Sequence, residues 1–452
     1  MKKWTTTQLI ALSFLALILA GALLLMLPFS SASGEATAPI DALFTATTSV
    51  CVTGLVTVST MSHWSAFGQT VILLLIQLGG LGIMTVSMAV LIFMGRRMNL
   101  REQVMVQETY SLDSLAGMRQ TVVKIIAGTF AAEAVGAFFY ALVYVPQFGF
   151  WRGVGASVFN AVSTFCNAGM DIVSEDSLAP YVTNPIINGI TILLIVLSGI
   201  GFLVWWDLAR VLREKKQSGI KNYRLFARLK LHSKLAIMTT LILIFGGAFL
   251  FLLFEWNNPQ TLGPLGVGGK MTAALFQSVT TRTAGFYTIH QGELRSASVL
   301  AALVLMFIGG SPMGTAGGVK TTTVAMLVLT FLAVMKGRRN TELFGRRVAI
   351  DSLRTALCVV MMAFGVALLG SLLLFLTDGF SFEDTLYEIV SAVATVGLSR
   401  GITAQLSDLG KLVVIAVMYI GRTGPITIAF LFFSGRNRGA AMELPESKIM
   451  IG

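Results

Sequence analysis

Four short segments of this sequence have residue types that could bind and pass a monovalent cation. Each contains a glycine followed by one large apolar residue, and the four glycines stand 115, 116 and 112 residues apart. Glycine adopts φ values that are closed to other residues, so it can turn consecutive carbonyls toward one axis. Such carbonyls can replace the hydration shell of an ion such as K⁺. The residues predicted to bind the ion are Val52, Thr53, Gly54, Asn167, Ala168, Gly169, Thr283, Ala284, Gly285, Thr395, Val396 and Gly397.

Charged side chains near these glycines bear on which ion they suit. Asp171 is the only acid directly beside one of the four glycines. A divalent cation favours several carboxylate ligands, so the pattern indicates a carbonyl filter for K⁺ or Na⁺. Arg282 and Arg400 are expected to brace the filter from behind, because a charge on the axis would block cations. An alternative is that the glycines only let helices pack closely, but four in register favour the filter.

A second glycine-rich stretch, residues 309–320, is predicted to form a gate below the filter. Its five glycines and one proline cannot hold a continuous helix, so we expect an unwound loop at mid-membrane. An alternative is a hinge or a close-packing patch. In the last repeat an arginine stands at the corresponding depth, where a buried charge indicates a function; its guanidinium could hold the loop's free carbonyls in the closed state. The predicted gate residues are Gly309, Gly310, Ser311, Gly314, Thr315, Ala316, Gly317, Gly318, Lys320 and Arg422.

The elements that position these residues follow from composition and repetition. Mean hydropathy is +0.79 and 12% of residues are charged, against roughly 25% in soluble domains. Apolar runs reach about 20 residues, the length of a membrane-spanning helix. Equal glycine spacing indicates an internal repeat. We therefore predict an all-α membrane protein with four tandem span–pore-loop–span repeats around a central pore, giving eight transmembrane helices and four re-entrant pore helices.

The repeats divide the chain at regular intervals. Repeats 1, 2, 3 and 4 are predicted at residues 1–115, 116–233, 234–350 and 351–452, the last with a C-terminal tail. The first spans are expected at 9–27, 121–145, 235–256 and 353–376. Short pore helices are expected at 40–50, 154–164, 271–279 and 382–392, and second spans at 68–94, 185–212, 298–335 and 409–433. Residues 9–27 could alternatively form a secretory signal, but their length and their place in the first repeat favour a span.

The basic residues indicate the orientation. Of 33 Lys and Arg residues, 25 lie in or beside the N terminus, the inter-repeat linkers and the C-terminal tail. By the positive-inside rule both termini and the linkers are cytoplasmic, and the pore loops enter from outside. This asymmetry accounts for the net charge of +11, so nucleic-acid binding is not needed to explain it.

The sequence gives little support for disulfides, a resident metal site or enzymatic catalysis. The three cysteines, Cys51, Cys166 and Cys358, are odd in number and lack ligand-type spacing, which argues against a disulfide framework or a resident metal site. The three histidines fall outside the predicted spans, and no nucleophile–base pair is apparent. An enzyme is therefore not expected, and the metal ion predicted at the filter is K⁺, held by backbone carbonyls.

Residues 280–286 and 309–320, supported by 77–84 and 421–425, resemble the Trk/Ktr/HKT superfamily of potassium transporters. The early first repeat and the C-terminal residues 444–452 are most similar to the KtrB-type membrane subunit of a bacterial Ktr potassium uptake system. The full TVGYG potassium filter is absent from all four repeats, which leaves K⁺ over Na⁺ selectivity open. Glycine in every repeat favours K⁺, because in this family a serine at the first position is associated with Na⁺ passage.

The resemblance implies partners that the residues alone do not. These are a homodimer in the bacterial plasma (inner) membrane, with one pore per protomer, and a cytosolic nucleotide-binding ring of KtrA-type subunits. It also implies Na⁺ as an activator. The chain has no nucleotide fingerprint of its own, so ATP or ADP would act only through the partner, and no cofactor is expected in this chain.

The predicted function is channel-like K⁺ uptake driven by the membrane potential, which is worth about 2.3 kcal/mol per charge per 100 mV. The alternative is a secondary cation transporter, coupled to Na⁺ or H⁺, with alternating access through broken helices. Four parallel repeats, each with an even number of spans, argue for the channel-like mechanism.

Overall fold

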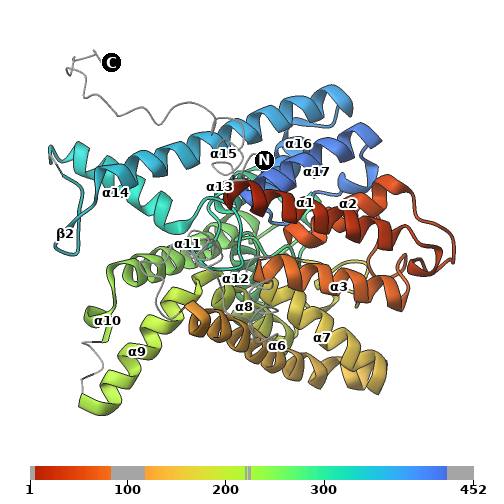
Figure 1. The fold of residues 1–452 in the computed structure, drawn as a ribbon, viewed down its shortest axis with the longest axis horizontal. Coiled ribbons are helices and arrows are strands. Elements are labelled where there is room, and N and C mark those ends of the chain that lie inside the picture. The colour runs from red at the N-terminus through yellow and green to blue at the C-terminus, as the bar shows by residue number, and fades with distance from the viewer. Residues whose placement is uncertain (1–5, 83–117, 219–220, 222–224, 339, 425–452) are drawn as a thin grey trace, which may run out of the picture.

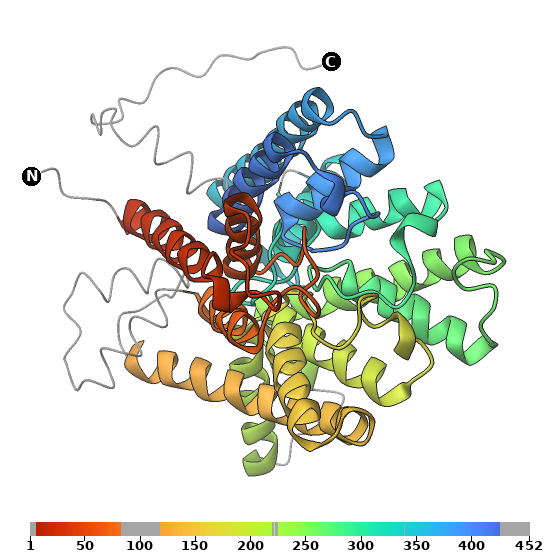
Figure 2. The ribbon, with the colours of Figure 1, turned by 90° about the vertical axis from the view of Figure 1, so that its right-hand side faces the viewer.

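The computed structural model describes residues 6–82, 118–218, 221, 225–338 and 340–424. The described secondary structure is helical apart from two isolated β-bridges and one antiparallel hairpin of two-residue strands, β1 (Glu342–Leu343) and β2 (Arg346–Arg347). Four groups of helices follow one another in chain order around a common centre (Figure 1, Figure 2). The predicted all-α membrane fold with pore loops is confirmed, whereas the residue boundaries of the repeats stay predictions.

Each group begins with a long apolar helix. These are α1 (Thr6–Leu25), α6 (Met118–Phe148), α11 (Leu231–Glu255) and α15 (Ile350–Thr377). All four are long and apolar enough to cross a membrane. Their outward faces carry exposed large side chains such as Phe249 and Leu368, as expected where lipid replaces water as the solvent. These helices therefore form the outer wall of the molecule.

A shorter helix follows in each group and points its C-terminal end into the protein. These helices are α2 (Pro39–Cys51), α7 (Phe150–Cys166), α12 (Val267–Thr280) and α16 (Phe382–Ala394). The last five residues of each are buried. The carboxyl end of a helix carries partial negative charge, so four such ends converge near the centre, where a cation would be stabilised.

In the second group a break corrects the predicted continuous span at 185–212, and in the third group the chain unwinds after its second helix, as predicted. The described second helices of all four groups have 12 to 16 residues. These helices are α3 (Ala66–Leu81), α8 (Pro185–Ile200), α13 (Ser296–Phe307) and α17 (Asp408–Thr423). Gly82, Gly201 and Gly424 end three of them at φ values of 80°, 90° and 88°. In the second group the chain continues as α9 (Phe202–Ser218) after a bend of 95°. By length and composition the described helices give four spans, or five if this bent pair is one span.

A segment from the third group packs against the bend at Gly201. A Cβ atom there would lie 2.3 Å from the carbonyl oxygen of Pro312, and the Phe202 N–H donates to the Met313 carbonyl at 3.2 Å. The loop after α13 therefore enters the break in α8–α9. The corresponding stretches 83–94 and 425–433 lie outside the described residues.

The remaining elements are short. The loop after α13 leads into α14 (Thr321–Met335), and α10 (Leu225–Arg228) precedes α11. Four 3₁₀ turns complete the described part: η1 (Pro28–Ser30), η2 (Ala179–Tyr181), η4 (Gln291–Glu293) and η5 (Thr403–Gln405).

The first and last groups pack against each other and close the circle (Figure 2). One apolar core cluster joins Val50 and Val52 of the first group to Val393 and Val414 of the last. The Lys411 ammonium pairs with an Asp41 carboxylate oxygen at 2.8 Å across the same boundary. Segments some 370 residues apart in sequence thus become neighbours.

Candidate ion-binding site

The four predicted filter glycines meet in a closed ring. Each ring glycine lies close to a backbone carbonyl oxygen of the next group. That oxygen belongs to the residue immediately before the next group's own ring glycine. A Cβ atom on Gly54 would lie 2.4 Å from the Ala168 oxygen, and one on Gly169 would lie 2.7 Å from the Ala284 oxygen. A Cβ atom on Gly285 would lie 2.7 Å from the Val396 oxygen, and one on Gly397 would lie 2.1 Å from the Thr53 oxygen. Real Cβ contacts of this kind do not come under 3.0 Å. No side chain therefore fits at these four positions. The glycine of the fourth group faces the first group, so the four contacts form a closed ring.

The backbone around the ring has the same unusual conformation four times. The four glycines have φ values of 99°, 66°, 84° and 92° in chain order. The residue two positions earlier also has positive φ in each group: Val52, Asn167, Thr283 and Thr395, at 53°, 61°, 71° and 51°. Positive φ is an outlier for β-branched residues and costs about 1–3 kcal/mol per residue. Strain repeated at the same place in four segments points to a functional constraint on the backbone.

Hydroxyl groups of the short helices hold the ring segments. The N–H groups of Gly54 and Gly397 donate to Thr48 Oγ1 at 2.9 Å and to Ser391 Oγ at 3.0 Å. The Ser163 hydroxyl accepts from the Met170 N–H at 3.1 Å and donates to its carbonyl at 2.5 Å. Three of these bonds use N–H groups, and the fourth uses the carbonyl of Met170, which follows the ring glycine. None of them uses the carbonyl oxygens that face the ring glycines, so those oxygens remain for an ion.

Four hydroxyl residues thus belong with the site although they are absent from the predicted filter residues. In the third group the Thr280 hydroxyl donates to the Phe286 carbonyl. The signal is visible only when the repeats are aligned on their glycines. Three repeats then have a hydroxyl residue six positions before the glycine, and the third has it five positions before.

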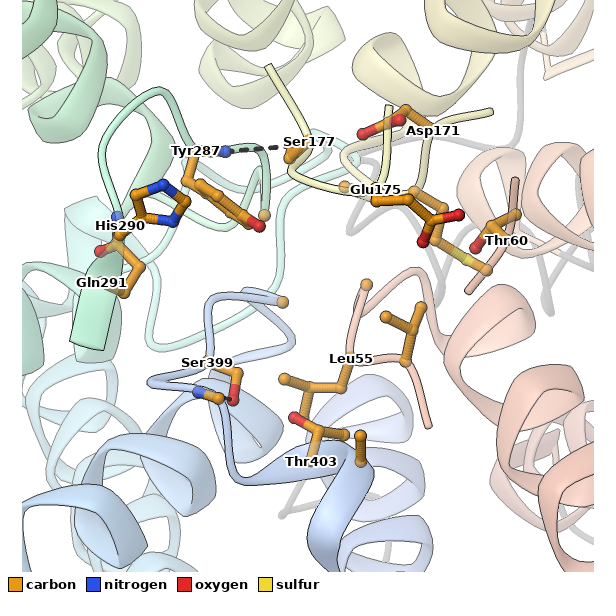
Figure 3. A pocket seen from close by; sticks show the side chains of 18 of the residues that line it. Leu55, Thr60, Asp171, Glu175, Ser177, Tyr287, His290, Gln291, Ser399 and Thr403 are labelled. Carbon is orange, nitrogen blue, oxygen red and sulfur yellow. Dashed lines mark hydrogen bonds between the residues drawn. The ribbon is translucent and has the colours of Figure 1, made fainter. Parts of the chain in front are cut away.

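A cavity of about 520 Å³ opens on one side of the ring and is lined by all four glycines. Asp171, Glu175 and Glu293 place three carboxyl groups in its wall, and Figure 3 shows Asp171 and Glu175 on the same side of the opening. Burial raises the pKa of Asp171 to about 6, although the N–H groups of two following residues donate to its carboxylate. The wall is therefore favourable to cations above that pH.

Arg400 lines this cavity rather than lying behind the ring, which corrects the expectation for it. Its Nε donates to an Asp384 carboxylate oxygen at 2.6 Å, and its Nη1 donates to the Gln291 carbonyl at 3.3 Å. The ion pair compensates the charge, and the second bond ties the fourth loop to the third. The Tyr287 N–H similarly donates to the Ser177 hydroxyl at 3.3 Å, joining the third loop to the second (Figure 3).

The glycine-rich loop between α13 and α14 lies against the ring. Its Gly317 N–H donates to Thr283 Oγ1 at 3.2 Å, and a Cβ atom at Gly317 would lie 2.1 Å from Thr395 Oγ1. Its Thr315 hydroxyl accepts from the Asn167 amide at 3.1 Å. None of the loop residues lines the cavity. The loop therefore contacts three ring segments on the side away from the cavity.

Close backbone approaches explain the loop's other glycines. A Cβ atom on Gly309 would lie 1.9 Å from the Gly317 oxygen, and one on Gly310 would lie 2.4 Å from Ala316 Cβ. A Cβ atom on Gly314 would lie 2.6 Å from the Ser198 oxygen, and one on Gly318 would lie 3.0 Å from Gly309 Cα. The Ser311 N–H donates to the Gly199 carbonyl at 2.8 Å, and the Ser311 and Thr321 hydroxyls bond at 2.8 Å. The loop is thus an ordered, unwound segment, as predicted.

The two positively charged side chains predicted at the gate, Arg422 and Lys320, both donate hydrogen bonds to this loop. Arg422 donates through Nη1 to the Thr315 carbonyl at 2.8 Å and through Nη2 to the Gly79 carbonyl at 2.5 Å. It therefore links the loop to the second helix of the first group. The Lys320 ammonium donates to the Ala316 carbonyl at 2.7 Å. Lys320 thus bonds within its own loop.

Comparisons with known proteins agree on one family. A family model named TrkH, described as a cation transport protein, matches residues 3–439. The chain is 37% identical to the Potassium/sodium uptake protein NtpJ of Enterococcus hirae, over 100% of this chain and 98% of that protein. It is 35% identical to the Ktr system potassium uptake protein B of Bacillus subtilis, over 100% and 97%.

A solved structure bears on the fold. The crystal structure of the potassium transporter TrkH from Vibrio parahaemolyticus matches with a TM-score of 0.73 and 18% identity. The match covers 95% of this chain and 85% of that one. The arrangement of the helices is therefore shared with a solved protein.

Proposed function

Because this chain belongs to the TrkH family of cation transport proteins, we propose that it is a channel-like K⁺ uptake protein whose ions pass the four-glycine ring. Membership makes it a multi-pass membrane transporter rather than an enzyme. The relatives above are named for potassium uptake, and one of them for potassium and sodium. K⁺ is accordingly the expected ion, and Na⁺ is the competitor to test.

The single observation that supports this proposal is the closed ring. Four carbonyl oxygens approach four glycines that have no room for a side chain. Short helices direct their carboxyl ends to the same place, and a cavity with three carboxyl groups lies outside. An ion could exchange water for carbonyl oxygens there. The membrane potential would supply about 2.3 kcal/mol per charge per 100 mV.

The glycine-rich loop is proposed as the gate, and Arg422 is proposed to hold it in the closed position. The two bonds from Arg422 to carbonyls are charge-assisted, and such bonds contribute about 1.5–3 kcal/mol each. Displacing the loop breaks its bonds to Asn167 and Thr283 as well. Opening therefore needs an external source of energy.

A partner is the proposed source of that energy. Relatives carry the name "Ktr system", and we place this chain as a homodimer in a bacterial inner membrane with both termini cytoplasmic. A KtrA-type ring that binds ATP or ADP would act on the cytoplasmic linkers, and Na⁺ would be an activator. The alternative remains a Na⁺- or H⁺-coupled secondary transporter.

The test is ⁸⁶Rb⁺ uptake into proteoliposomes at a set diffusion potential, with and without the nucleotide-binding partner. We expect uptake that scales with the electrochemical gradient and is inhibited by K⁺ more strongly than by Na⁺. A fixed ratio of Rb⁺ to Na⁺ or H⁺ would favour the secondary transporter. A folded protein that takes up no Rb⁺ even with its partner would reject the proposal.

A further inference from the structure

Arg282 is a buried cation close to the ring with little to compensate its charge. It lies three residues before Gly285, and its side chain is 4% exposed. Nη2 contacts Thr240 Oγ1 of α11 at 3.4 Å, and Nε has no hydrogen-bond partner. Among the described residues, no carboxylate forms an ion pair with it. Because a guanidinium is not deprotonated in proteins, the site holds a permanent positive charge.

The other two arginines beside the ion path differ in this respect. Arg400 is paired with Asp384, and Arg422 donates to two carbonyl oxygens. Next to Arg282 the chain supplies an apolar cluster that includes Val279, Ala284 and Ile244. Burying an uncompensated charge costs several kcal/mol. A residue that merely braced the loop would not require a charge, so this cost indicates an electrostatic role.

We infer that the charge of Arg282 sets how tightly the ring holds cations, and that it disfavours divalent ions twice as strongly as monovalent ones. The inference rests on the proposed passage of cations through the ring. Arg282 lies three positions before Gly285, so their Cα atoms lie within about 10 Å. The repulsion is proportional to the charge of the ion. It therefore keeps K⁺ binding weak enough for release and excludes ions such as Ba²⁺, Ca²⁺ and Mg²⁺.

The expected size follows from Coulomb's law. At roughly 12 Å and an effective dielectric constant of about 20, the repulsion of a unit charge weakens affinity about tenfold. For a divalent ion at the same place the same relation gives about a hundredfold. Removing the charge should thus change divalent affinity by the square of the change in monovalent affinity.

The experiment measures equilibrium binding to the purified full-length protein in K⁺-free buffer, so that it does not depend on gating. ⁸⁶Rb⁺ binding gives the monovalent affinity, and competition by Ba²⁺ against Rb⁺ gives the divalent affinity at the same site. The variants are Arg282→Gln and Arg282→Met, which remove the charge. Arg282→Lys keeps the charge, and Thr240→Val removes the hydrogen-bond partner but not the charge.

We expect Rb⁺ to bind about tenfold and Ba²⁺ about a hundredfold more tightly to both neutral variants. The ratio of the two affinities should stay within about threefold of wild type in Arg282→Lys and Thr240→Val. Equal shifts for both ions, or a Thr240→Val variant that matches Arg282→Gln, would mean that Arg282 only braces the loop. A folded wild-type protein that binds no Rb⁺ would instead count against the ring as the ion site. The two failures are therefore distinguishable.

Discussion

Replacing Gly397 by alanine perturbs the ring where its approach is closest. The new methyl group would lie 2.1 Å from the Thr53 carbonyl oxygen and 2.9 Å from Gly54 Cα. Gly397 also has a φ of 92°, which costs an L-residue roughly 1–2 kcal/mol. Forcing a methyl group into a packed site adds roughly 1–3 kcal/mol. The ring geometry should therefore be disfavoured by roughly 2–5 kcal/mol in total.

Gly379 offers a matched control in the same group of helices. It has a φ of 68°, and a Cβ atom there would meet nothing within 4 Å. Gly379→Ala should therefore introduce backbone strain without a clash. We expect it to lower the stability of the detergent-solubilised protein by roughly 1–2 kcal/mol, while ⁸⁶Rb⁺ uptake per folded protein stays at the wild-type level.

The assay is ⁸⁶Rb⁺ uptake into proteoliposomes, normalised to folded protein by size-exclusion chromatography. Gly397→Ala should lower uptake at least about 30-fold, which is the equivalent of about 2 kcal/mol. If Gly397→Ala took up Rb⁺ as fast as Gly379→Ala, the close approach between Gly397 and Thr53 would not matter for passage. The assignment of the ring as the ion path would then be refuted.

Three further substitutions test other parts of the site. Arg422→Ala removes two charge-assisted bonds from the loop and should raise basal ⁸⁶Rb⁺ uptake tenfold or more; unchanged or lost uptake would contradict the gate assignment. Gly54→Ser places a side chain 2.4 Å from a ring oxygen, so it should lower Rb⁺ uptake, as Gly397→Ala does, and let Na⁺ compete more strongly with the Rb⁺ uptake that remains; unchanged discrimination would contradict the filter assignment. The carboxyl of Asp171, whose pKa burial raises to about 6, is charged at pH 7.5 and neutral at pH 5. Uptake at subsaturating K⁺ should therefore fall several-fold as external pH drops, and Asp171→Asn should abolish this step; a variant that kept it would show that Asp171 is not the titrating group.

Several parts of the site could be predicted because they depend on local sequence. Positive φ and close backbone approach select glycine, so the four ring positions and the unwound loop are visible as glycines at regular spacing. The hydroxyl residues behind the ring carry a weaker signal, because serine and threonine are common and only their offset from the glycine distinguishes them. Thr48, Ser163 and Ser391 share that offset, and Thr280 departs from it by one residue.

The partners of the charged residues could not be predicted in the same way. Arg282 and Arg400 look alike in sequence, as single arginines beside a filter segment. Arg400 turns to Asp384 and the cavity, whereas Arg282 turns to Thr240 and is buried. The difference depends on which side chains neighbouring helices supply, and these come from residues 16 and 42 positions away.

The sequence by itself determined the helical membrane fold, the four similar units and the glycine positions. In lipid, backbone polar groups must be satisfied within a segment, so apolar length and spacing carry most of that information. Only the tertiary structure decided that the second span of the second group is broken, that the bend at Gly201 accommodates the loop, and which carbonyl faces each glycine. These features arise from contacts between segments about a hundred or more residues apart. They depend on how the four units close into a ring, and no local pattern records that closure.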